Sequence, residues 1–147
     1  MSDEPDISRR AFLTRSGMAV AAAAQGTGAR IVTILTDPSD PVAAAAPARW
    51  AAKELEEALT AAGCTVQTQS RMGEAAPGSL CIVAAGGSAP LAREALKAAG
   101  IAAPDKAEAL VLASSKAGGK PVLVACGADA RGLADALLEL ADRVRHA

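Results

Sequence analysis

Residues 108–142 read EALVLASSKAGGKPVLVACGADARGLADALLELAD, and this stretch decides the fold. Two apolar runs, 109–113 and 122–126, flank the segment KAGGK, whose Gly-Gly pair is typical of a β-hairpin turn. A helix is expected after Gly132, because apolar residues then recur at a helical spacing that lays one face on a sheet. Those apolar residues are Leu133, Leu137, Leu140 and Val144.

Three further strands and two further helices are expected upstream of this stretch. Strand patterns cover 31–35, 64–69 and 80–84, and the alternating second pattern indicates an edge strand. Pro47 suits the first turn of a helix that Gly63 ends. Ser88 is a candidate cap for a helix over 89–99, which Gly100 ends. The order βαββαββα predicts the α/β class, with a mixed, mainly parallel sheet covered by helices.

Composition excludes several classes of partner. The chain has 147 residues and a net charge of −1, and its only aromatic residues are Phe12 and Trp50. Nucleic-acid binding needs clustered basic residues or stacking aromatics, so no nucleic-acid partner is expected. No stretch reaches the roughly 20 strongly apolar residues of a stable membrane span.

The first 29 residues contain the clearest localisation signal in the sequence. Ser8-Arg9-Arg10-Ala11-Phe12-Leu13-Thr14 resembles the twin-arginine export motif, with Arg9, Arg10, Phe12 and Leu13 in the matching places. A short, weakly apolar segment and small-residue cleavage sites follow. We therefore expect a signal peptide over 1–29 and one domain over 30–147. The twin-arginine translocase would be a partner, and the folded protein would be periplasmic or secreted.

Two glycine turns are candidate anion sites. Gly86-Gly87-Ser88 joins a strand to a helix, where backbone N–H groups can hold an anion, although the same residues also make an ordinary turn. The segment 127–132 is similar and includes Gly127, Asp129 and Arg131. Neither turn has the full pattern of a P-loop or a dinucleotide fingerprint. Arg131 opposes the helix dipole at a helix start, which favours a pairing with Asp129, the nearest carboxylate, over ligand binding.

Catalytic and metal-binding patterns are weak. Asp37 and Asp40 flank a loop after the first strand, at a carboxyl end where open α/β sheets bind ligands. Two carboxylates there could serve metal or acid–base chemistry, but Asp-Pro-Ser-Asp-Pro is more simply a turn. The only histidine, His146, is next to last in the chain, so a triad is not expected. The spacing of the three cysteines fits no zinc site, and no metal or cofactor is expected. Cys81 and Cys126 are interpreted as buried thiols, or as a disulfide if their strands are neighbours.

Three segments together resemble an accessory domain of glycoside hydrolases. They are 51–55 (AAKEL) in an early helix, the glycine-ended strand 80–86, and 122–127 followed by Arg131-Gly132. The similar domain is the small α/β domain that precedes the catalytic barrel in family 20 β-N-acetylhexosaminidases and in α-glucuronidases. The family commonly has Tyr and Gly after Arg-Gly, where this chain has Asp135 and Ala136. Its catalytic carboxylates lie in the barrel, so no catalytic residue is transferred.

Two functions follow as hypotheses. The resemblance implies a non-catalytic accessory domain of an exported, carbohydrate-degrading hydrolase, docking against a glycoside hydrolase catalytic domain in the same chain or in a partner. The alternative is a stand-alone periplasmic ligand-binding protein or small enzyme, with its site at the carboxyl ends of the strands. The first predicts a large exposed patch, and the second predicts polar groups that converge on one concave site.

Overall fold

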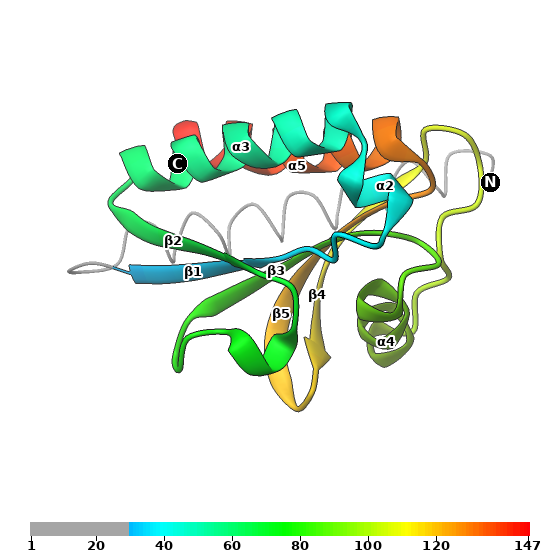
Figure 1. Ribbon diagram of the computed structural model, residues 1–147, viewed down its shortest axis with the longest axis horizontal. Coiled ribbons are helices and arrows are strands. Elements are labelled where there is room, and N and C mark those ends of the chain that lie inside the picture. Colours follow the sequence, from blue (N-terminus) through cyan, green and yellow to red (C-terminus); the bar gives the residue numbers. More distant parts are fainter. Residues whose placement is uncertain (1–29) are drawn as a thin grey trace.

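The computed structural model describes residues 30–147, which form a five-stranded sheet with helices on both faces (Figure 1). The expected signal peptide, with Arg9, Arg10, Phe12 and Leu13, lies outside the described residues. The strands are β1 (Arg30–Leu35), β2 (Cys64–Gln69), β3 (Leu80–Gly86), β4 (Leu110–Ala117) and β5 (Lys120–Gly127). The helices are α2 (Pro41–Ala44), α3 (Ala46–Ala61), α4 (Pro90–Ala99) and α5 (Ala130–Arg145), with the 3-10 turn η1 (Met72–Glu74).

The sheet order is β2-β1-β3-β5-β4, and all neighbours are parallel except β4 and β5. Gly118 and Gly119 have φ of 56° and 76°, so the β4–β5 hairpin turns through two left-handed residues that glycine adopts easily. The α3 crossover makes β1 and β2 neighbours, and β2 takes the edge. The α/β class, the mixed mainly parallel sheet and the edge position of β2 are confirmed.

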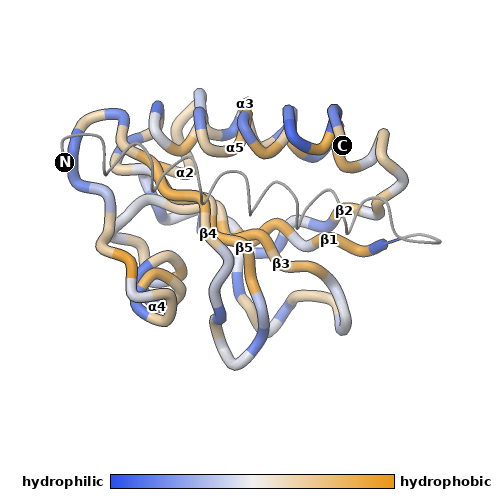
Figure 2. The backbone as a smooth tube through the Cα atoms, turned by 180° about the vertical axis from the view of Figure 1, so that it is seen from behind, coloured by the Kyte–Doolittle hydropathy of each residue, from blue (hydrophilic) through white to orange (hydrophobic). Residues whose placement is uncertain are grey.

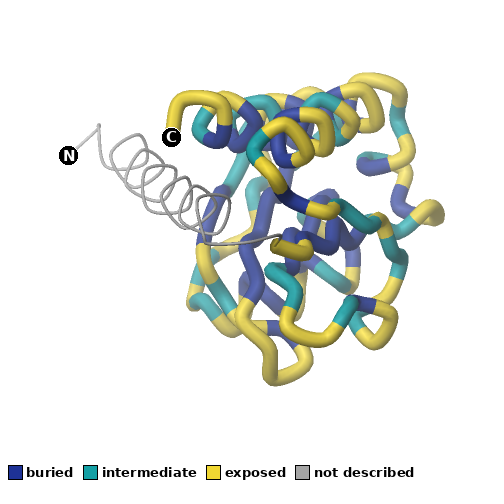
Figure 3. The backbone as a smooth tube through the Cα atoms, turned by 90° about the vertical axis from the view of Figure 1, so that its left-hand side faces the viewer, coloured by how far each residue is buried: buried dark blue, intermediate teal, exposed yellow. Residues whose placement is uncertain are grey.

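Each face of the sheet has its own apolar core. On one face α3 and α5 pack against each other and against the strands, with Leu55, Leu59 and Leu137 fully buried. On the other face α4 packs its alanines and Leu96 against β3 and β5. Figure 2 shows hydrophobic residues along the central strands and hydrophilic ones along the outer side of the layer formed by α3 and α5. Figure 3 shows the same layering as buried strands beneath exposed outer surfaces.

Three details differ from the sequence expectations. The short helix α2 was not expected, and it forms because the Asp40 side chain caps it and Pro41 starts it. Helix α4 is capped at Ala89 without a side-chain bond, so the predicted Ser88 cap is wrong. Between β2 and β3, where the sequence predicts neither a strand nor a helix, η1 makes one 3-10 turn.

The cysteines are free and buried, so the disulfide alternative is wrong. Cys81 lies opposite Val122, and Cys126 lies opposite Ala85, on the neighbouring strands β3 and β5. The two cysteines are thus four residues out of register, or about 13 Å along the strands, which is too far to bridge.

No helix within residues 30–147 is long and apolar enough to cross a membrane.

Candidate functional site

The turn after β3, where an anion site was considered, is filled by the protein itself. Asp40 is buried, and its Oδ2 accepts a hydrogen bond from the Gly86 N–H at 2.8 Å. Its Oδ1 accepts from the Val42 N–H at 3.0 Å and so caps α2. A Cβ on Gly86 would lie 2.8 Å from Val42, so glycine is required here for close packing. A carboxylate of the chain therefore already occupies the crevice between β1 and β3.

Gly87 and Ser88 likewise do not form an open anion-binding turn. The Gly87 N–H donates to the Gly127 carbonyl oxygen at 3.0 Å, which joins the ends of β3 and β5. A Cβ on Gly87 would lie 3.2 Å from the Pro104 carbonyl oxygen, so the 103–104 segment covers this glycine. Ser88 is exposed beside the turn.

The second glycine turn is also built for packing. Asp129 caps α5 by accepting from the Gly132 N–H at 2.8 Å, and its other oxygen accepts from the Glu108 N–H at 3.0 Å. These hydrogen bonds, from Gly132 first and Glu108 second, lower the pKa of Asp129. Glu108 has a φ of 61°, so this bond holds a residue in a conformation that non-glycine residues rarely adopt. Gly127 lies directly against the first turn of α5, where a side chain would meet backbone atoms.

Arg131 pairs with a different carboxylate from the one expected. Within residues 30–147 its ion-pair partner is Glu108, whose Oε2 lies 3.8 Å from Arg131 Nη1, and both side chains are largely exposed. The expected pairing with Asp129 is present only as a weaker charge interaction: after the hydrogen bonds from Gly132 and Glu108, the charge of Arg131 also lowers the pKa of Asp129. The pair with Glu108 spans two segments that lie side by side, but such an exposed ion pair contributes little to stability.

Among the expected site residues that lie within 30–147, Asp37 borders a sizeable pocket. Its Oδ1 accepts from the Ser39 hydroxyl at 2.7 Å and from the Ser39 N–H at 2.9 Å. These bonds, the side-chain one first, lower the pKa of Asp37. Asp37 therefore carries a negative charge at neutral pH.

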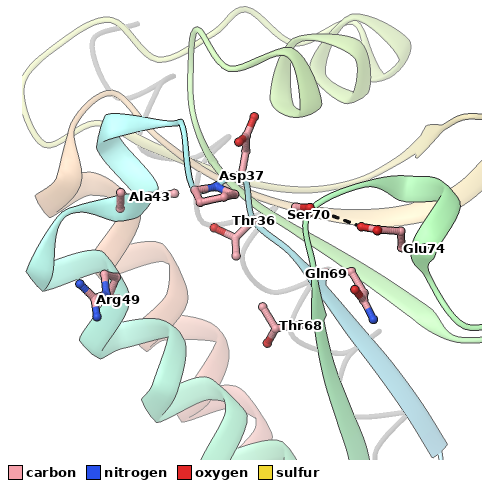
Figure 4. A pocket seen from close by; sticks show the side chains of 10 residues that line it. Thr36, Asp37, Ala43, Arg49, Thr68, Gln69, Ser70 and Glu74 are labelled. Carbon is pink, nitrogen blue, oxygen red and sulfur yellow. Dashed lines mark hydrogen bonds between the residues drawn. The ribbon is translucent and has the colours of Figure 1, made fainter.

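The pocket beside Asp37 lies at the carboxyl ends of β1 and β2, and we call it the α3–β2 groove. It has a volume of about 560 Å³ and is lined by Thr36, Asp37, Pro38, Ala43, Ala44, Arg49, Thr68, Gln69, Ser70 and Glu74. Figure 4 shows Arg49 on one side, Ser70 and Glu74 on the opposite side, and Thr36 and Thr68 between them. Polar side chains thus converge from two strand ends, a helix and a 3-10 turn.

The geometry of α3 and β2 explains why this space is open. The two elements are joined by the tight turn at Gly63, whose φ is 98°, and they diverge from that turn towards the carboxyl end of β2 (Figure 1). A second hollow of about 290 Å³ shares Thr36, Arg49 and Thr68 with the groove. It extends the groove along α3 to Ala52, Lys53 and Glu56.

The charges of the groove are unevenly placed. Arg49 and Lys53 lie on α3, and within residues 30–147 neither is among the side chains that form ion pairs. Asp37 and Glu74 lie on the other walls, and Glu74 accepts a hydrogen bond from the Ser70 hydroxyl at 3.3 Å. The groove therefore offers a cation on the helix wall, threonine hydroxyl groups between the walls, and carboxylates on the other walls.

Sequence reasoning missed most of the groove, including Arg49, Thr68, Gln69, Ser70 and Glu74. One signal was present: a right-handed helical crossover makes β1 and β2 parallel neighbours, so the residues after both strands meet at one edge. Thr36 and Ser70 follow those strands directly. No sequence signal identifies Arg49 as a groove residue, because its position relative to the groove depends on the distance of α3 from the sheet.

Comparison of the chain with protein-family models, with curated proteins and with solved structures finds no match.

Proposed function

We propose that residues 30–147 form a non-catalytic binding domain that takes a small polar ligand in the α3–β2 groove. The observation that carries this proposal is the convergence of Thr36, Arg49, Thr68, Ser70 and Glu74 on one concave site at strand carboxyl ends. Such ends are where open α/β sheets bind ligands, and a few placed polar groups orient a ligand in a pocket of this size.

The ionisable groups support binding over proton transfer. A general acid or base works best with a pKa near the operating pH, whereas hydrogen bonds from Ser39 lower the pKa of Asp37. His146 lies at the end of α5, where its Nδ1 is 3.2 Å from Asp142, far along the chain from the groove residues. Burial raises the pKa of Cys64, and it raises the pKa of Cys126 to about 12, which disfavours a nucleophilic thiolate.

The setting that we propose is an exported carbohydrate-degrading system. The resemblance of 51–55, 80–86 and 122–132 to glycosidase accessory domains supports it, as does the twin-arginine motif with Arg9 and Arg10. In this setting the domain travels folded through the twin-arginine translocase and works in the periplasm or outside the cell.

A second candidate function is docking against a glycoside hydrolase catalytic domain. One observation favours it: Trp50 is 57% exposed on α3, where it shares a hollow with Ala46, Arg49 and Lys53. Exposed tryptophans are enriched at protein interfaces because the ring offers a large contact area with a polar edge. This surface adjoins the groove through Arg49, so a docked barrel would cover one end of it.

The test of the binding function is a nuclear magnetic resonance titration of 15N-labelled protein without the leader. The probes are N-acetylglucosamine, glucuronate and the tripeptide Ala-Val-Ala, added one at a time. We expect at least one probe to shift the amide signals of Thr36, Thr68 and Ser70 in a saturable way. Arg49→Gln should weaken that response, while Arg93→Gln, a matched change on the exposed side of α4, should not. Shifts that avoid the groove with every probe would refute the binding function.

The docking function needs a separate experiment in the cell that exports the protein. A photoreactive amino acid at position 50 should capture a protein that has glycoside hydrolase activity, and the same group at Lys97 on α4 should not. Capture at both positions, or of proteins without that activity, would exclude specific docking through Trp50.

A further inference from the structure

Among residues 30–147, no strand pairs with the outer edge of β2, which lies beside the groove. β2 is the first strand in the sheet order and pairs only with β1 among the described strands. The Gln69 carbonyl oxygen accepts from the Thr36 N–H at 2.9 Å, so the backbone groups of Gln69 face β1. Because these groups alternate along a strand, the N–H and C=O of Thr68 and Val66 face outward.

The other sheet edge is protected in ways that β2 is not. On β4, the Ser115 hydroxyl donates to the Ala95 carbonyl oxygen, and Lys116 adds a charge. The hairpin end is tied to α4 by a bond from the Gly118 N–H to Glu94 Oε2 at 2.7 Å. β2 has the sequence CTVQTQ, with neither charge nor proline. Charges and prolines are the usual guards against strand addition, so β2 is the edge open to an added strand.

The groove places a cation where such a strand would end. Thr68, the last outward-facing residue of β2, lines the α3–β2 groove together with Arg49. Lys53 lies one helical turn further along α3 and lines the adjoining hollow. Both side chains are exposed on the helix wall that faces Thr68. A carboxylate is the anionic group of a chain end, and Arg binds it with two parallel hydrogen bonds.

We propose that the groove binds an extended peptide that adds to the edge of β2 as a parallel strand, with its C-terminal carboxylate at Arg49. This inference rests on the proposed binding function and names its ligand class. Backbone hydrogen bonds to Thr68 and Val66 supply affinity, and the charge at Arg49 fixes direction and register. The parallel direction follows because Arg49 lies at the carboxyl end of β2.

Three peptides test the inference on the unmodified domain, by calorimetry and by amide signal shifts. They are Ala-Val-Ala, its C-terminal amide, and the same tripeptide N-methylated at the central residue. We expect Ala-Val-Ala to shift the amides of Val66 and Thr68. The amide should bind about tenfold more weakly or worse, because a charge-assisted hydrogen bond is lost. The N-methyl peptide should also bind more weakly, because it lacks one strand-pairing donor.

Variants of the protein give an independent reading. Thr68→Pro removes the outward N–H at a position where an edge strand tolerates proline, and it should abolish binding. Thr65→Val, at an exposed position of β2 outside the groove whose backbone groups face β1, should bind Ala-Val-Ala within about twofold of the parent. Circular dichroism checks that both variants fold.

Each remaining outcome has a defined meaning. Equal affinity for the acid and the amide, or for the N-methyl peptide, would overturn the inference. Binding of N-acetylglucosamine or glucuronate in the groove without any peptide response would overturn the inference and leave the binding function standing. A response to no probe at all would overturn both. A dimer in light scattering that Thr68→Pro dissociates would assign the β2 edge to a second copy of the chain and overturn the peptide ligand.

Discussion

The carboxylate of Asp40 accepts a hydrogen bond from the backbone N–H of Gly86, which lies 46 residues further along the chain, at 2.8 Å. Asp129 does the same at the other turn, where it accepts from the Glu108 N–H while it caps α5. Each aspartate thus uses one oxygen to start a helix and the other to hold a distant segment. The positions where an external anion was considered are filled by these two side chains, and the open pocket lies one strand further out.

Replacing Asp40 with Ala should cost about 2–4 kcal/mol of the free energy of unfolding, because it removes a helix cap and leaves the Gly86 N–H unsatisfied in a buried place. Urea unfolding followed by circular dichroism measures this loss. Asp37→Ala is the control, since within residues 30–147 its carboxylate bonds to Ser39 alone, in an exposed turn. Equal losses for the two variants would contradict the structural role of Asp40.

The lowered pKa of Asp129 predicts that its contribution to the stability of the fold depends on pH. Hydrogen bonds lower this pKa in the folded protein, so the contribution is present above the unfolded pKa of about 4 and is lost as the pH falls through the folded value. Asp129→Asn should therefore reduce the difference in stability between pH 7 and pH 3. Asp135→Asn, on an exposed position of the same helix, should leave that difference as it is in the parent protein.

Gly132 is packed so closely that a larger residue there should destabilise the protein, which its position in the sequence does not indicate. A Cβ at this residue would run into the carbonyl oxygen of Ala109, which holds the segment before β4 against α5. Gly132→Ala should destabilise the protein by about 1–3 kcal/mol, as overpacking does elsewhere. Gly73 has open space around it and no left-handed φ, so Gly73→Ala should change stability by less than about 0.5 kcal/mol.

The local patterns of the sequence predicted the fold well because their causes are local. The alternation of apolar residues, the Gly-Gly turn at 118–119 and the helical spacing from Leu133 to Val144 depend on neighbours in the chain. The candidate site could not be predicted in the same way. Whether the N–H groups at Gly86 face solvent or Asp40 depends on how the loop after β1 folds back over β3. The groove depends on the divergence of α3 from β2, which no short motif encodes.

The thiol of Cys126 should be unreactive in the folded protein, and its burial should lower the stability of the fold at high pH. Burial, with the charge of Asp40 as a smaller cause, raises its pKa to about 12. The folded state therefore keeps the proton while the unfolded thiol loses it above about 8.5, so this contribution to stability is full below that pH and declines as the pH rises towards 12. Cys126→Ser should change this pH dependence, because it removes the titrating thiol. Rapid labelling of all three cysteines at pH 8 without denaturant would contradict their burial.

The fluorescence of Trp50 should report the charge on the surface of α3. Trp50 is the only tryptophan of the chain and is 57% exposed, so its fluorescence should be quenched readily by small solutes. Because Arg49 and Lys53 share a hollow with it, iodide should quench more strongly than caesium at equal ionic strength. A variant that lacks both basic side chains, with Arg49→Gln and Lys53→Gln together, should lose most of the difference between iodide and caesium quenching. The matched variant on α4, with Arg93→Gln and Lys97→Gln, should preserve that difference. Equal quenching by the two ions in the unmodified protein would show that the cations do not act at this surface, and the charge argument for a bound carboxylate would fail with it.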